Sequence, residues 1–191
     1  MIEDLFEDFI KHYKLPVQKI PDKTYIEYVS KLLGFSDKWE NFCSRVSERF
    51  EGSREKYREN YNKTKDKFLD YVKSFPECTN FIEQDMSKFS IQKPKDLMSD
   101  IYNHASRGRY FMSVDLKKAN FQALKYCGFF KGIDSWEDLM KKFTDLPELI
   151  ESKYLRSILC GQLNPARQIL IEYWLIWNKI YHLIKNEDFK L

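Results

Sequence analysis

The sequence predicts a mainly α-helical protein, a bundle of about eight to ten helices with at most one short strand pair near residues 109–114. Apolar residues recur along most of the 191 residues at intervals of three and four, which places them on one face of a helix. Hydrophobic residues make up 43% of the chain and aromatic residues 16%, which is sufficient for a core and excludes a disordered chain.

The first part of the chain is expected to form four helices. Residues 2–13 carry apolar side chains at helical spacing, and Pro16 cannot continue that helix. Each of the next three helices begins at a residue type that caps helices, so they are expected to run from Asp22 or Thr24 to residue 33, from Ser36 to residue 50, and from Ser53 to residue 74. The last of these is highly charged and is expected to be the most exposed.

The remaining part is expected to be less regular. Residues 76–100 contain prolines and many polar residues, which favours short helical turns. Residues 109–114 read RYFMSV, a run of aromatic and β-branched residues typical of a strand. Further helices, bounded by capping residues, glycines and prolines, are expected at residues 117–126, 134–143, 145–161 and 166–184. The last is apolar around most of its surface, which predicts a central position in its lobe.

The irregular segment suggests a division of the chain. We expect an N-terminal helical lobe at residues 1–75, a connecting segment at 76–100, and a C-terminal helical lobe at 101–191 that carries a basic segment. A single domain is the alternative, because 191 residues fit one domain comfortably.

Composition and spacing argue against several classes of protein. The first residues, MIEDLFEDF, are acidic where a signal peptide is basic, and the longest apolar run, residues 169–184, is short for a bilayer span. The cysteines form no CxxC pair and the histidines stand alone, so no zinc site is expected. We therefore expect a cytoplasmic, intracellular protein with no membrane partner and no cofactor.

Asp115 directly follows the predicted strand. A carboxylate at a strand end is held rigidly with its oxygens facing solvent, which suits a Mg²⁺ ligand. Aspartate is also a common N-cap, and Asp115 stands just before a helical run. Metal ligand and helix cap are therefore alternative roles for this residue, and Asp115 is the candidate catalytic residue if the chain is an enzyme.

Two short segments resemble motifs of family A DNA polymerases. Val114, Asp115 and Leu116 are similar to the palm strand that ends in a metal-binding Asp and runs into a helix. The segment RSILCG, residues 156–161, resembles the fingers helix motif, with Arg156 in place of its Lys and Cys160 in place of its aromatic residue. The resemblance implies that Asp115 holds metal and that Arg156 contacts an incoming triphosphate. Cys160 and the lack of a second strand-borne carboxylate depart from the family pattern.

A basic segment surrounds the predicted strand. Residues 101–133 contain six Lys or Arg and one Asp, in a chain whose formal net charge is +3. Cations interleaved with aromatic side chains can bind phosphates and stack on bases. The candidate residues for such contacts are Arg107, Arg109, Tyr110, Phe111, Lys117 and Lys118. An acidic protein partner and a solvated face around a buried strand are the alternatives.

Arg156 and Arg167 lie on either side of the turn from Gly161 to Pro165. The free N–H groups at the N-terminus of the last helix attract anions, so both arginines are candidate anion ligands. A salt bridge would explain Arg167 equally well.

These features favour a small, non-enzymatic binding protein that acts on nucleic acid or on a nucleic-acid-handling protein. Abundant Lys, Asn, Ile, Tyr and Phe are typical of AT-rich genomes, many phages among them, which fits a phage or mobile-element accessory protein such as an inhibitor of a host defence nuclease. The alternative is a metal-dependent nucleotidyl- or phosphoryl-transfer protein, or a degenerate polymerase-like fragment, centred on Asp115 with Mg²⁺ as its cofactor.

Overall fold

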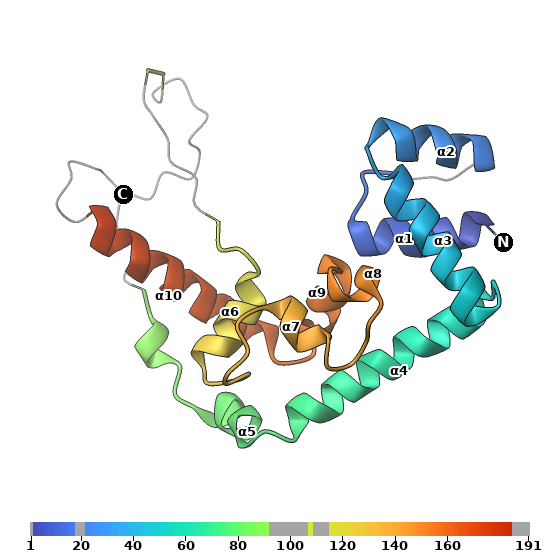
Figure 1. Cartoon of the computed structure of the whole chain (residues 1–191). Coiled ribbons are helices and arrows are strands. Elements are labelled where there is room, and N and C mark those ends of the chain that lie inside the picture. The colour runs from blue at the N-terminus through green and yellow to red at the C-terminus, as the bar shows by residue number, and fades with distance from the viewer. Residues whose placement is uncertain (1, 18–21, 92–106, 109–114, 185–191) are drawn as a thin grey trace.

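The structure, a computed structural model, describes residues 2–17, 22–91, 107–108 and 115–184. Within these ranges the chain forms ten α-helices and one 3₁₀ helix and contains no strand (Figure 1). The predicted mainly α-helical bundle is therefore confirmed. The strand predicted at residues 109–114 lies outside the described residues.

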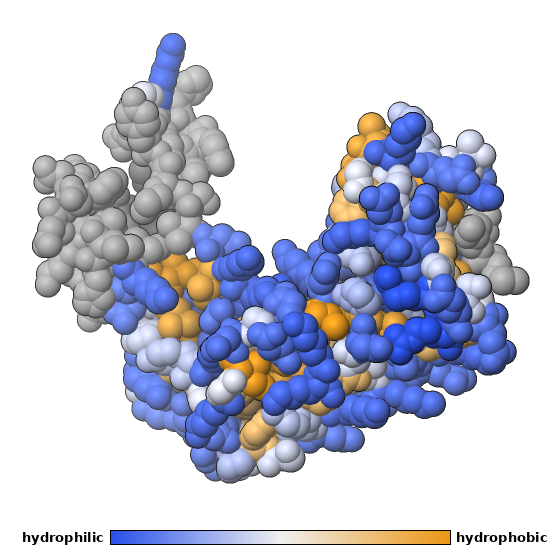
Figure 2. All heavy atoms as spheres, in the orientation of Figure 1, coloured by the Kyte–Doolittle hydropathy of each residue, from blue (hydrophilic) through white to orange (hydrophobic). Residues whose placement is uncertain are grey.

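Apart from residues 90–118, the helices follow one another through short connections. In chain order they are α1 (Ile2–Tyr13), α2 (Lys23–Leu32), α3 (Ser36–Phe50), α4 (Arg54–Lys73), α5 (Pro76–Glu83), the 3₁₀ helix η1 (Ser87–Phe89), α6 (Ala119–Tyr126), α7 (Trp136–Met140), α8 (Pro147–Ile150), α9 (Lys153–Gly161) and α10 (Pro165–Ile184). Figure 1 shows α1, α2 and α3 gathered at one end, with α4 running from them along one edge toward α5. Hydrophilic side chains cover most of the visible face along α4 (Figure 2).

Local capping explains where several helices begin. Asp22, Ser53 and Ser135 each accept a hydrogen bond from the backbone N–H three residues later, at 2.9, 3.2 and 3.1 Å. Such a bond satisfies one of the N–H groups that the first turn leaves unpaired. The prediction that Ser36 caps α3 is wrong, because Phe35 occupies the cap position and Ser36 is the first helical residue.

The helix predicted at residues 145–161 is two helices, so that prediction is wrong. Ser152 interrupts it with an extended backbone, and its Oγ accepts a hydrogen bond from Leu155 N–H at 3.0 Å. The same Oγ lies 3.0 Å from Nδ1 of His12, so the break is anchored to α1. A local cap therefore begins α9, and a contact with a distant residue holds that cap in place.

The buried apolar side chains form a single cluster that extends from Leu5 to Ile171. Helix α1 packs on α8 and α9 as well as on α2 and α3, and α4 contacts both α3 and α9. Within the cluster, the Phe68 ring on α4 lies 5.5 Å from that of Trp136 and 5.6 Å from that of Phe143. A continuous core favours the single-domain alternative over two separate lobes.

Two buried ion pairs join distant helices. Arg45 Nη2 on α3 lies 2.8 Å from Glu148 Oε2 on α8, and the Glu148 side chain is fully buried. Arg54 Nε on α4 lies 2.8 Å from Asp8 Oδ2 on α1. Burial would raise the pKa of Asp8, but hydrogen bonds from Arg54 and Arg58 outweigh it and lower the pKa below its ordinary value.

The position predicted for α10 is wrong. This helix packs chiefly on α6, and its other side leaves Ile169, Leu170 and Tyr173 exposed by 48%, 45% and 61%. Its apolar surface is wider than the face that α6 can cover, so the helix lies at one side of the fold (Figure 1). No helix in the described ranges combines the length and apolarity needed to cross a membrane.

Candidate anion-binding site

A pocket of about 450 Å³ lies between the N-terminus of α6, helix α9 and helix α10. We call it the arginine pocket, and its lining residues are Asp115, Leu116, Lys117, Lys118, Ala119, Asn120, Lys153, Arg156, Ser157 and Glu172. Four of the site residues predicted from the sequence are therefore brought together, although Arg156 is far from the other three in the chain. These are Asp115, Lys117, Lys118 and Arg156.

The guanidinium of Arg156 is the central feature of this pocket. Arg156 is only 8% exposed, and its Nε–H donates a hydrogen bond of 3.3 Å to Oδ1 of Asn120. It forms no ion pair with any described residue. Burial lowers the pKa of the guanidinium, but an arginine side chain stays charged in proteins. The charge of Glu137 offsets part of this effect of burial without forming an ion pair with Arg156. A buried guanidinium with no direct ion pair among the described residues is suited to bind an anion.

The N-terminus of α6 adds backbone donors to the lining. Lys118 is the N-cap, with a left-handed φ of 57°, and its side chain does not cap the helix. Asn120 Oδ1 accepts a hydrogen bond from Phe121 N–H at 2.9 Å. Among the described residues no side chain caps the N–H groups of Ala119 and Asn120 at the positive end of the helix dipole. The alternative in which Asp115 caps this helix is wrong, because Leu116, Lys117 and Lys118 separate it from the first helical residue.

The lysines of the pocket differ in their partners. Lys118 forms an ion pair with Glu137 on α7. Burial would raise the pKa of Glu137, but the hydrogen bond and the charge of Lys118 outweigh burial and lower it. Lys117 and Lys153 are exposed and pair with none of the described residues. Arg156, Lys117 and Lys153 are thus the cations available to a ligand.

Two acidic side chains, Asp115 and Glu172, also line the pocket. Asp115 is exposed, and burial raises the pKa of Glu172. No group of three or more His, Cys, Asp or Glu within the described ranges could hold a metal ion. Two carboxylates among four basic side chains fit an anion better than the Mg²⁺ that the polymerase resemblance implies. Cys160, in the place of that family's aromatic residue, is fully buried and does not line the pocket.

The other predicted site residues lie elsewhere. Arg109, Tyr110 and Phe111 fall outside the described residues, and Arg107 is exposed but does not line the pocket. Arg167 donates a hydrogen bond of 2.7 Å from Nη1 to the carbonyl oxygen of Gln84. It therefore ties α10 to the end of α5 and is not part of the arginine pocket.

Asn120, Lys153 and Glu172 are among the lining residues that were not predicted as site residues from the sequence. Lys153 precedes Arg156 by three residues, the spacing that places two side chains on one helix face, so this pair could have been found. Asn120 and Glu172 carry no local signal, because they reach the pocket only through the packing of α6 against α9 and α10.

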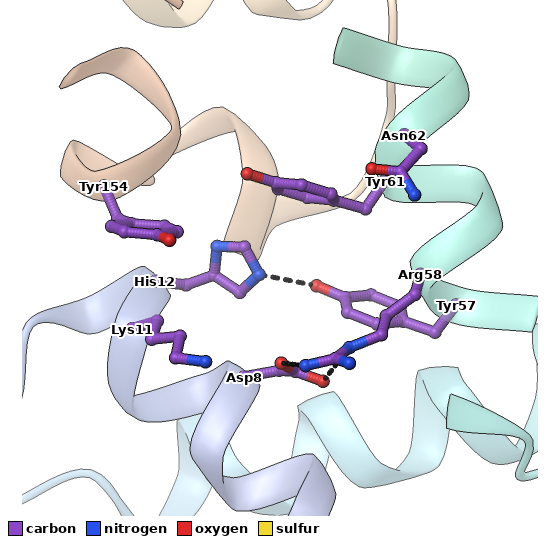
Figure 3. A pocket seen from close by; sticks show the side chains of 8 residues that line it. All are labelled: Asp8, Lys11, His12, Tyr57, Arg58, Tyr61, Asn62 and Tyr154. Atoms are coloured by element: carbon purple, nitrogen blue, oxygen red, sulfur yellow. Dashed lines mark hydrogen bonds and ion pairs between the residues drawn. The ribbon is translucent and has the colours of Figure 1, made fainter. Parts of the chain in front are cut away.

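A second pocket, of about 240 Å³, lies between α1, α4 and α9. We call it the histidine pocket, and it is lined by Asp8, Lys11, His12, Tyr57, Arg58, Tyr61, Asn62 and Tyr154 (Figure 3). His12 Nε2 lies 3.0 Å from the Tyr57 hydroxyl, and His12 Nδ1 lies 3.0 Å from Ser152 Oγ. Burial lowers the pKa of His12 to about 4, so the imidazole is neutral at pH 7. With both ring nitrogens bonded, His12 is a link between helices.

No family model, curated protein or solved structure matches this chain. The resemblance to family A DNA polymerases therefore stays a prediction. The two pockets are the basis on which a function can be argued.

Proposed function

We propose that this chain is a non-enzymatic binding protein that holds a phosphate group of a nucleic acid in the arginine pocket. The observation that carries the proposal is the Arg156 guanidinium, which is 8% exposed and forms no direct ion pair with a described residue, although the charge of Glu137 acts on it from a distance. A guanidinium can bind phosphate through two parallel N–H groups, and toward the described residues Arg156 uses only its Nε–H.

The surroundings of Arg156 support a phosphate polymer as the ligand. Lys117 and Lys153 are exposed on the pocket lining, where they can reach neighbouring phosphates. Three phosphate contacts, one from each cation, would make log K fall with log salt with a slope of about −2 for a single strand. An isolated phosphate ion would not give that dependence.

The test is fluorescence anisotropy of labelled single-stranded and double-stranded DNA and RNA between 50 and 200 mM salt, a range over which phosphate contacts weaken measurably (about twentyfold for the slope above). The variant Arg156→Gln should weaken binding to all of them and reduce the slope by about one. Lys31→Gln is the matched control, because Lys31 is exposed on α2, which contributes no residue to the arginine pocket. Equal binding by the two variants would overturn the proposal.

Two other predictions from the sequence stay open to direct measurement. A nucleic-acid-handling protein as partner, including a host defence nuclease, predicts a stable complex with such a protein that Arg156→Gln weakens and free nucleic acid does not displace. Phosphoryl transfer predicts Mg²⁺ binding, because Asp115 and Glu172 both line the pocket. Calorimetric titration of Mg²⁺ into the protein and into Asp115→Asn tests that alternative, and heats that are equal in both would contradict it.

A further inference from the structure

The arginine pocket and the histidine pocket lie on two sides of the first turn of α9. Tyr154 lines the histidine pocket, and its chain neighbour Lys153 lines the arginine pocket. Successive residues of an α-helix differ by about 100° in direction and only ~1.5 Å in height. One extended ligand can therefore contact both pockets by crossing a single helical turn.

The histidine pocket presents aromatic rings from three helices. Tyr61 on α4 and Tyr154 on α9 both lie beside the His12 imidazole of α1 (Figure 3). The ring centroids of His12 and Tyr61 are 5.7 Å apart, and Tyr154 is 36% exposed. The pocket volume of about 240 Å³ is far above the roughly 15 Å³ that one water molecule needs. The His12 and Tyr61 rings are too close to admit a ring between them, so the exposed ring of Tyr154 is the surface on which a planar ring can stack.

Polar groups on the lining can pair with the edge of such a ring. Asn62, which is exposed, offers an amide with both donors and an acceptor, and Tyr61 offers a hydroxyl. Lys11 is exposed on the lining and can contact a phosphate. A face for stacking, an amide for edge contacts and a cation nearby together match a nucleobase within a nucleic acid chain.

We infer that the histidine pocket takes an unpaired nucleobase from the strand whose phosphate occupies the arginine pocket. The ligand is then single-stranded nucleic acid, because the bases of a duplex are stacked and paired and cannot turn into a pocket without unstacking. The inference rests on the proposed function, since it deepens the identity of the ligand at the neighbouring site.

The test distinguishes contacts to a base from contacts to a phosphate. Tyr154→Ala removes a stacking ring, and Tyr25→Ala is its matched control, because Tyr25 is also 36% exposed but lies on α2. The loss of one stacked base should weaken binding to a labelled single-stranded oligonucleotide roughly five- to a hundredfold. It should leave the salt slope unchanged, since no phosphate contact is lost. Tyr154→Phe should restore the affinity of the wild type, and wild type should bind the matched duplex more weakly than the single strand.

Binding by the two variants shows whether the base pocket or the phosphate pocket is wrong. If Tyr154→Ala binds the single strand like wild type while Arg156→Gln does not, the base pocket is wrong and the phosphate pocket stands. If Arg156→Gln binds like wild type, the phosphate pocket is wrong. Adenosine, which has no phosphate, then tests the base pocket alone: at millimolar concentration it should shift the NMR signals of the Tyr61 and Tyr154 rings. Unchanged signals would overturn the inference.

Discussion

Nε2 of His12 on α1 lies 3.0 Å from the hydroxyl oxygen of Tyr57 on α4, although 45 residues separate them in the chain. The other ring nitrogen lies 3.0 Å from Oγ of Ser152, the residue that caps α9. One imidazole therefore joins α1, α4 and α9, and its environment makes the stability of the fold depend on pH.

Stability is expected to fall as the pH drops from about 6.5 to about 4, because burial lowers the pKa of His12 from 6.5 to about 4. The unfolded chain takes up a proton first in this window, so protonation favours unfolding, by roughly 3 kcal/mol at full effect. Urea unfolding of wild type and His12→Gln across this window measures the loss. The variant should lack it, and an equal pH dependence in both proteins would contradict the prediction. Asp8, with its lowered pKa, adds a further loss at lower pH in both proteins.

Arg156→Met is expected to stabilise the ligand-free protein. The change replaces a buried guanidinium that has no direct ion pair among the described residues with an apolar side chain, which should raise the free energy of unfolding by about 1 kcal/mol. Thermal unfolding in chloride buffer measures this gain. Added phosphate should raise the melting temperature of wild type but not of the variant, since binding to the folded state stabilises it. A variant less stable than wild type in chloride would show that Arg156 is structural.

Arg45→Met is expected to destabilise the fold strongly. Glu148 is fully buried, and its Oε1 has no hydrogen-bond partner among the described residues. Loss of its ion-pair partner Arg45 leaves the carboxylate with only the more distant charge of Arg49, at a cost of about 3 kcal/mol. Burial already raises the pKa of Glu148, and loss of Arg45 raises it further. Stability that depends on a raised pKa is lost as the pH rises, so the cost should be larger at pH 8 than at pH 5.

The double variant Arg45→Met/Glu148→Gln is the control for that pair. It removes both charges and should recover most of the lost stability, whatever the pH. Urea unfolding of wild type, Arg45→Met, Glu148→Gln and the double variant completes the double-mutant cycle. If the double variant is as unstable as Arg45→Met, the loss reflects packing of the arginine side chain and not the ion pair.

Gly128→Ala and Gly161→Ala should have opposite effects. Gly128 follows α6 with a φ of +91°, where an alanine costs about 1–2 kcal/mol, although its Cβ would meet only Glu77 Cγ at an ordinary 3.7 Å. Gly161 is the last residue of α9, and a Cβ there meets nothing within 4 Å. Alanine at that position should stabilise the helix by about 0.5–1 kcal/mol. The changes in unfolding free energy of the two variants follow from denaturation midpoints measured at equal m-values. A Gly128→Ala variant as stable as wild type would contradict the argument from the positive φ of Gly128.

The sequence predicted those features that depend on nearby residues. Ser53 and Ser135 begin their helices through bonds to N–H groups three residues away, so their role is visible in the sequence. Ser152 begins α9 in the same way, but its buried position depends on His12, 140 residues away. The break between α8 and α9 was missed for this reason.

The candidate site, too, depends on contacts between residues that are distant in the chain. The charges of Lys117, Lys118 and Arg156 made them candidates, but only the packing of α6 against α9 brings them to one pocket. Arg167 also looked like an anion ligand, yet its partner is the backbone carbonyl of Gln84. A backbone acceptor is present at every residue, so no sequence pattern could have indicated that bond.

The closure of α1 against α8 and α9 affects how the chain folds during its synthesis. A ribosome adds about 5–20 residues per second, so the 140 residues between His12 and Ser152 take roughly 7–28 s. During that time the side of α1 that packs on α8 and α9 has no cover, and a product truncated before residue 147 would never cover it. Completion of the fold therefore waits for the last quarter of the chain, and prematurely terminated chains should expose an apolar helix face that chaperones and proteases recognise.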